Sequence, residues 1–119
     1  MQLPHADKIK REQIVRKLEA CSLNINHVRG KHKARLFRSI LGITLENKEV
    51  FVEALLANVT TSEATLTKSD RYGRHYTIDF RLTTDIGSSM IRTAWIIGDD
   101  EQYPALTSTY PIKTSGEKS

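Results

Sequence analysis

The clearest chemical signal in the sequence is a His-Lys pair, His32 and Lys33, inside the apolar-periodic segment 31–41. At 100° per residue, Lys33 falls within the apolar arc of a helix and His32 lies at the edge of that arc. A lysine directed towards a core is costly to desolvate unless an anion receives its ammonium group. Alternatively, the stem packs and the ammonium group escapes to water. The pair therefore indicates either a phosphate-binding or catalytic site, or a structural lysine.

A second group of polar residues lies on the alternating segment 74–82. There His75 shares a face with Thr77 and Asp79, opposite the apolar face that contains Tyr76. Such a polar sheet face is either exposed to solvent or forms the floor of a cleft. Neighbouring strands could add further groups to it: Arg92, Thr93, Ser108 and Tyr110.

These residue types suit a metal-independent ribonuclease. An imidazole can take the proton of a ribose 2′-hydroxyl, Lys or Arg can stabilise the phosphorane, and a Ser or Tyr hydroxyl can bind a phosphate oxygen. The sequence has no CxxC pair, P-loop or GxGxxG, so we expect neither a metal nor a cofactor. The catalytic candidates are His32, Lys33, His75, Thr93, Ser108 and Tyr110, and the substrate-binding candidates are Lys31, Arg35, Arg74 and Arg92.

The charge distribution favours a polyanionic partner. The formal net charge is +4, and residues 1–60 contain eleven Lys or Arg against six Asp or Glu. No acidic residue lies between Ala20 and Leu45, whereas five basic residues fall within residues 29–38: Arg29, Lys31, Lys33, Arg35 and Arg38. A basic cluster attracts nucleic acid by steering and counterion release. The competing interpretation is a solvated helix face.

The elements that must position these residues are helices in the first half and strands in the second. Apolar spacing predicts helices over 11–20, 31–41 and 46–58, the second ended by Gly42 as a left-handed cap. Period-two patterns then predict strands over 61–68, 74–82, 90–97 and 105–110, the last stopped by Pro111. This order predicts an α+β fold, with the N-terminal helices packed on one face of a roughly four-stranded antiparallel meander.

Length and composition bound the remaining possibilities. The 119 residues are enough for one domain, which we expect over residues 1–111, with a disordered tail over 112–119. The longest apolar runs are far shorter than the ~20 residues of a membrane span, so we expect no membrane partner. The single cysteine, Cys21, cannot form an internal disulfide, which favours a reducing, cytoplasmic location.

Several segments taken together resemble a bacterial domain family of unknown function. They are Leu3–Lys8, Gly30–Phe37 with Leu41–Gly42, Tyr72–Tyr76, Arg92–Ile97 and Pro104–Pro111. The family occurs as small toxin–antitoxin-like proteins and as C-terminal cassettes of polymorphic toxins. Its order of elements is similar to that of the barnase–EndoU–colicin–RelE type of ribonuclease toxin. By position, the resemblance implies site roles for His32, Lys33, Thr93, Ser108 and Tyr110, although the family commonly has Thr where this chain has Ser108.

Two functions of different classes follow from these observations. The first is a small ribonuclease toxin acting on RNA, with transfer RNA as one candidate, and neutralised by an acidic antitoxin or immunity protein. The second is a non-catalytic module that binds RNA or an acidic protein through residues 29–38. Growth arrest on induction in bacteria would distinguish the first from the second.

Overall fold

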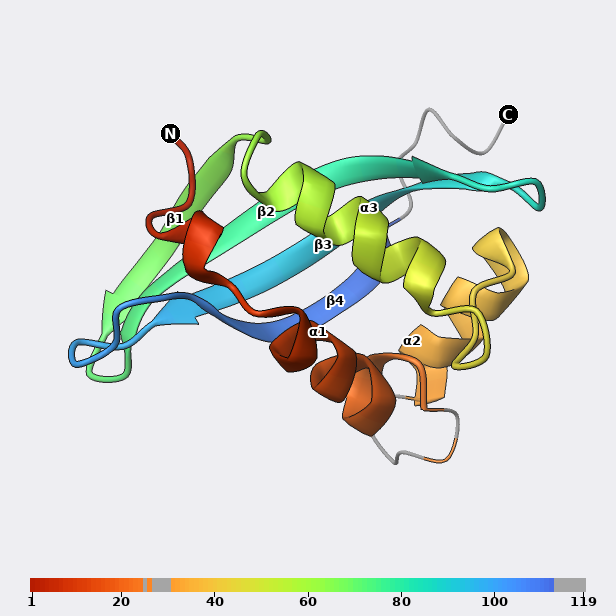
Figure 1. The fold of residues 1–119 in the computed structure, drawn as a ribbon, viewed down its shortest axis with the longest axis horizontal. Coiled ribbons are helices and arrows are strands. Elements are labelled where there is room, and N and C mark those ends of the chain that lie inside the picture. The colour runs from red at the N-terminus through yellow and green to blue at the C-terminus, as the bar shows by residue number, and fades with distance from the viewer. Residues whose placement is uncertain (25, 27–30, 113–119) are drawn as a thin grey trace.

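The structure is a computed structural model that describes residues 1–24, 26 and 31–112. Its strands form one antiparallel sheet in the order β1-β2-β3-β4. The helices all precede the strands, so the predicted α+β meander is confirmed (Figure 1). The main elements are α1 (Arg11–Lys17), α2 (Lys31–Leu36), α3 (Glu49–Val59), β1 (Ala64–Asp70), β2 (Gly73–Thr83), β3 (Ser88–Ile97) and β4 (Ala105–Ile112).

The helices cover one face of the sheet, and the hydrophobic core lies between the two layers. Figure 1 shows α3 crossing that face, with α1 and α2 beside β4. Phe51 of α3 packs between Phe37 and Phe80, with ring centroids 5.0 and 6.4 Å away. Alternate strand residues, such as Ile78 and Trp95, are almost fully buried under the helices. The opposite side, which we call the open face, has no such cover among the described elements.

The first two helices end in wider turns. After α1, residues Leu18–Ser22 form a π-helical turn, and after α2 residues Phe37–Leu41 do the same. Gly42 then ends the second helix at φ 69°, as the sequence predicts. Its N–H donates to the Arg38 carbonyl at 2.9 Å, which satisfies one of the last free carbonyls of the turn.

The last strand is longer than its sequence pattern predicts. Strand β4 continues through Pro111, which pairs with Ile91, and ends at Ile112. The prediction that Pro111 stops the strand is therefore wrong. Because β4 is an edge strand, a proline can be accommodated where its missing N–H would face away from the sheet. Residues 113–119 lie outside the described part of the chain.

The β1–β2 turn depends on one glycine. Gly73 has φ 135°, and a side chain there would overlap the carbonyl oxygen of Ile97. The turn is closed by Asp70, whose carboxylate accepts the Tyr72 N–H at 3.0 Å. The predicted turn at residues 70–73 is thus present, with strand β1 starting at Ala64 rather than Thr61.

Candidate functional site

Strands β2, β3 and β4 bring three polar side chains into one row on the open face. In the strand register, Arg92 lies opposite Asp79 on one side and Tyr110 on the other. The Arg92 guanidinium donates twice to Asp79, from Nε to Oδ1 and from Nη2 to Oδ2, both at 2.9 Å. This bidentate pair raises the pKa of Arg92 further, with a smaller contribution from Tyr110, against an opposing effect of burial. Asp79 therefore keeps Arg92 charged and fixed beside Tyr110.

Helix α2 adds a second cation to this row. The Lys33 ammonium lies 5.2 Å from the centroid of the Tyr110 ring, a distance at which a cation is attracted to an aromatic face. Lys33 and Tyr110 are both half-buried. Two cations and a phenol thus converge from α2, β3 and β4. We call Lys33, Asp79, Arg92 and Tyr110 the Tyr110 cluster.

Hydroxyl groups lie in the next row of the same face. Thr77 and Ser108 flank Ala94 in the register, two positions along the strands from Arg92, or about 7 Å. A bulge in β4 beside Ala94 and Trp95 leaves Thr107 as the extra residue, and its hydroxyl donates to the Ala94 carbonyl at 3.0 Å. Downstream of this bulge, Ser108 and Tyr110 share the open face.

Thr93 is not brought to this site. It lies on the covered face and is 1% exposed. Its hydroxyl donates to the Ile78 carbonyl and accepts a hydrogen bond from Trp95 Nε1, both at 2.9 Å. The hydroxyl is fully used within the core, so Thr93 supports the fold and is remote from any solvent-borne substrate.

His75 lies on the open face but belongs to a different contact. Its Nε2 is 3.0 and 3.1 Å from the two carboxylate oxygens of Asp70. The hydrogen bond to His75 is the main reason that the pKa of Asp70 is lowered, with help from the Tyr72 N–H and Lys68 and against burial. His75 is four positions along β2 from Asp79, or about 13 Å. Arg74 is exposed, has the strand parity of Tyr76 and is likewise outside the cluster.

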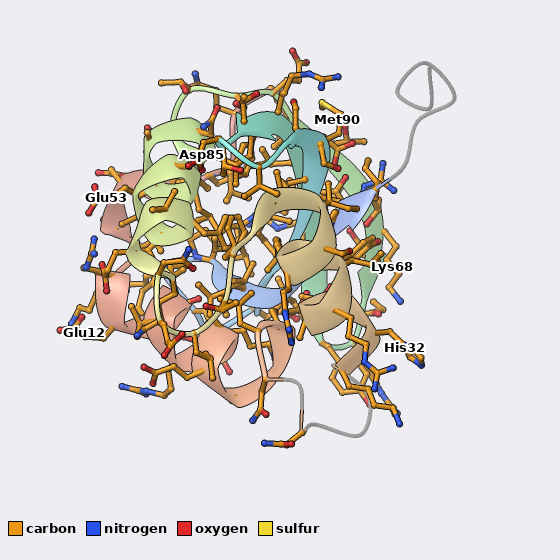
Figure 2. All side chains as sticks on the ribbon, turned by 90° about the vertical axis from the view of Figure 1, so that its right-hand side faces the viewer. Glu12, His32, Glu53, Lys68, Asp85 and Met90 are labelled. Atoms are coloured by element: carbon orange, nitrogen blue, oxygen red, sulfur yellow. The ribbon has the colours of Figure 1, made fainter. Side chains whose placement is uncertain are left out.

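The remaining candidates lie along α2. His32, Arg35 and Arg38 are exposed and Lys31 is half-buried, and we call these four residues the basic rim. In Figure 2, His32 projects on the side of the molecule that also carries Lys68 of β1. Among the described residues, His32 makes no hydrogen bond with the Tyr110 cluster. Arg29, which the sequence analysis placed in the basic cluster, lies outside the described residues.

Asp79 is the site residue that the sequence analysis missed. The β2–β3 hairpin is centred on residues 85–86, and residues equidistant from that centre pair with each other. The rule depends on knowing the centre of the turn: the predicted strands 74–82 and 90–97 centre it on residue 86, which would have placed Asp79 opposite Thr93, one residue from Arg92. No comparable local signal links Lys33 to Tyr110, because these residues meet only through the packing of α2 against β4.

Metal-binding groups and membrane-spanning helices are two further features that bear on function. In the described ranges, no group of three or more His, Cys, Asp or Glu side chains is placed to hold a metal ion. Over the same residues, no helix has both the length and the apolar character needed to cross a bilayer.

Comparison with known proteins gives a family without an assigned activity. A search of the curated proteins finds no match, and neither does a search of the solved structures. The profile of a domain of unknown function, DUF6883, matches residues 2–113, which include every element described above. The chain therefore belongs to the DUF6883 family of domains of unknown function.

Proposed function

We propose that this domain is a small RNA-cleaving toxin whose reaction centre is the Tyr110 cluster. The observation that carries the proposal is the convergence of the Lys33 ammonium, the Arg92 guanidinium and the Tyr110 phenol from three separate elements. Two cations beside a hydroxyl donor match the trigonal-bipyramidal phosphorane of phosphodiester cleavage, whose charge lies on its non-bridging oxygens. The helices-then-meander order supports the analogy with ribonuclease toxins.

In the proposed reaction the RNA supplies its own nucleophile. The 2′-hydroxyl attacks the adjacent phosphorus and loses its proton to an imidazole, for which we assign His32, exposed and one residue before Lys33. The 2′-O–P bond forms and the P–O5′ bond breaks. The Tyr110 hydroxyl gives the leaving O5′ its proton and is reprotonated from water. Lys33 and Arg92 balance the phosphorane charge, while Asp79 holds Arg92 in place.

The basic rim supplies the attraction for the substrate. Lys31, Arg35 and Arg38 have no carboxylate within 4 Å among the described residues, so their charge is available to a polyanion. Binding to RNA should weaken with salt at a log–log slope of about −0.7 per phosphate contacted. A protein in which Lys31, Arg35 and Arg38 are changed to Glu should lose this binding, and unchanged affinity would contradict the proposal.

The decisive experiment is cleavage of RNA by purified protein, together with growth arrest on induction. Lys33→Met and Tyr110→Phe should each lower the cleavage rate by about 10²–10⁴-fold, because each removes one polar group and keeps the packing volume. Lys68→Met is the matched control, since Lys68 is also a lysine near the sheet surface but lies on β1. Melting temperatures separate loss of chemistry from loss of fold. Full activity of both variants, folded as wild type, would contradict the proposal.

One observation favours the alternative of a non-catalytic RNA- or protein-binding module. Of the two candidate imidazoles, His75 is held by Asp70, and among the described residues His32 makes no hydrogen bond with the Tyr110 cluster. A binding module would retain RNA affinity that depends on Lys31 and Arg35 but would leave RNA ends unchanged after induction. Sequencing of RNA ends in induced cells distinguishes the two functions.

We further propose that an acidic antitoxin or immunity protein silences the domain by covering the basic rim, within the cytoplasm. Carboxylates facing the rim would compete directly with RNA phosphates. Hydrogen exchange on a purified complex should show protection of residues 31–38. A complex in which this segment exchanges as fast as in the free protein would contradict this assignment.

A further inference from the structure

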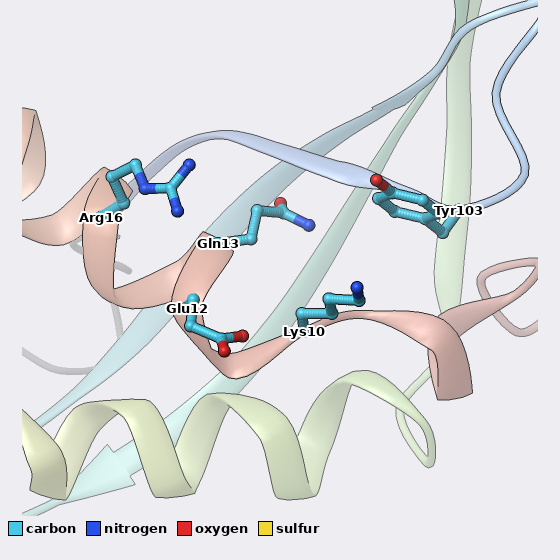
Figure 3. Close-up of a pocket in the computed structure, with 5 residues that line it drawn as sticks. All are labelled: Lys10, Glu12, Gln13, Arg16 and Tyr103. Atoms are coloured by element: carbon cyan, nitrogen blue, oxygen red, sulfur yellow. The ribbon is translucent and has the colours of Figure 1, made fainter.

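A polar hollow lies at the opposite end of β4 from Tyr110. It has a volume of about 370 Å³ and is lined by Lys10, Glu12, Gln13, Arg16 and Tyr103. Figure 3 shows the Gln13 side chain between Arg16 and Tyr103, with Lys10 and Glu12 along the same rim. Its size is within the range of small-molecule sites, about 300–1,000 Å³. We call it the Gln13 hollow.

The floor of the hollow is rigid because Gln13 bonds to the edge of β4. Its Nε2 donates to the Pro104 carbonyl at 3.1 Å, and its Oε1 accepts the Leu106 N–H at 2.6 Å. The side-chain amide thus occupies the place that a neighbouring peptide group would take in a sheet. These bonds use one of the two Nε2 N–H groups and one lone pair of Oε1 and fix the amide in place, so we expect the charged groups around Gln13 to dominate recognition.

Two of those groups are cations, Lys10 and Arg16. Neither Lys10 nor Arg16 has a carboxylate oxygen within 4 Å in the described part of the chain, and Glu12 is the one acidic side chain in the lining. The neighbouring Arg11, by contrast, is paired with Glu49 and Glu53. The lining carries a net charge of +1, which suits an anion such as a single phosphate diester.

An adjoining hollow of the same volume is lined mainly by apolar and aromatic groups instead of charged ones. It shares Gln13 and Tyr103 with the first and adds a floor of apolar and aromatic residues with one carboxylate: Tyr72, Ile96, Gly98, Glu101 and Ala105. Tyr103 is 41% exposed, so its ring is available for stacking, whereas the Tyr72 ring has the Arg71 guanidinium 4.9 Å from its centroid. An aromatic wall next to a cationic one matches a nucleotide, with its base against Tyr103 and its phosphate between Lys10 and Arg16. Glu101 repels a phosphate from the base end.

We propose that the Gln13 hollow is a second nucleotide subsite, and that the substrate is single-stranded RNA lying along β4. The inference rests on the proposed function and names its substrate class. Ala105 at this end and Tyr110 at the other are five positions apart on one strand, roughly 15 Å, so one short oligonucleotide can reach both. A base must be unstacked to lie on Tyr103, which excludes a regular duplex.

The test measures binding of 2′-O-methyl RNA, which cannot be cleaved, by fluorescence anisotropy. Wild-type protein should bind an octanucleotide more tightly than a dinucleotide and more tightly than a duplex of the same length. We call the ratio of octanucleotide affinity to dinucleotide affinity the octanucleotide advantage. In the double variant Lys10→Gln/Arg16→Gln this advantage should shrink about tenfold, and the log–log slope of affinity against salt should become shallower by about 0.7. Tyr103→Ala should shrink the advantage by about fivefold or more through lost stacking.

The control is Lys8→Gln/Lys17→Gln, which removes the same charge from the same segment outside the hollow. An octanucleotide advantage that persists in Lys10→Gln/Arg16→Gln and Tyr103→Ala, while Lys33→Met still weakens cleavage, overturns the subsite and leaves the proposed function intact. If Lys33→Met does not lower RNA cleavage and the rim substitutions do not weaken RNA binding, the proposed function fails, and the subsite fails with it.

Discussion

The two faces of the sheet are made from the same strands but follow different rules. On the covered face, Trp95 and Ile91 are fully buried. The buried Thr93 hydroxyl both donates and accepts a hydrogen bond, whereas the hydroxyl of its buried neighbour Thr109 has no hydrogen-bond partner among the described residues. On the open face, Arg92 and Tyr110 are only half-buried and are held by charge pairing and a helix-borne lysine. Hydrophobic packing therefore specifies one face, whereas the polar contacts of the other face leave groups that can still act on a ligand.

The largest expected effect is on stability, which should depend more on the covered face than on the open face. Trp95→Ala removes a fully buried indole from the core and should lower the free energy of unfolding by about 3–5 kcal/mol. Ile96→Ala, one residue along β3 on the open face, should cost clearly less because Ile96 is only half-buried. Urea denaturation measures both. Equal losses would show that the open face is packed as tightly as the covered one.

A smaller effect compares two threonines with identical chemistry. Thr93→Val keeps the shape but removes the bond to Ile78 and leaves Trp95 Nε1 buried without an acceptor, which should cost about 1–3 kcal/mol. Thr77→Val, on the open face, should change stability by less than about 0.5 kcal/mol. Equilibrium unfolding of the two variants checks this difference, and a Thr93→Val protein as stable as wild type would contradict the assigned role.

Asp79→Asn tests what holds the open face together. The pair with Arg92 is about one-third exposed on each side, so solvent screening limits its contribution to stability to about 1 kcal/mol or less. Under the proposed function, in which Asp79 positions Arg92, RNA cleavage should fall about 10- to 100-fold with little change in melting temperature. Asp79→Glu, which keeps the charge, should retain more activity than Asp79→Asn. An Asn variant as active as wild type would remove Asp79 from the site.

The smallest effect concerns pH. The pKa of Asp70 is lowered from its usual 3.8 by His75, so the folded state holds this carboxylate in its charged form more strongly than the unfolded state does. The resulting stabilisation is present above about pH 4 and is lost as the pH falls through the lowered value. Wild type should therefore melt slightly above Asp70→Asn at neutral pH, and the gap should close in acid. A gap that widens in acid would reverse the sign.

The sequence predicts the covered face better than the open one because residues that pack in the core recur at regular spacings along helices and strands. The helical stripes and the alternation through Tyr76 and Ile78 predict the layers and which side is buried. The position of Pro111 in β4 and the π-helical turn at Phe37–Leu41 depend on neighbouring chain segments, so no local sequence pattern predicts them. The contact of Lys33 with Tyr110 arises only when α2 docks against the last strand.

The hydrogen bond between Gln13 and Leu106 links the first helix to the last strand, so its formation depends on the order in which the chain is synthesised. It joins residues 93 positions apart, so the N-terminal helix cannot be fixed until the last strand exists. The same is true of Lys33 and Tyr110, since the partner of the early lysine is among the last described residues to be synthesised. A nascent chain on the ribosome therefore has the basic rim before it has a complete Tyr110 cluster. Under the proposed function, the order of synthesis itself delays toxicity until the whole domain has emerged.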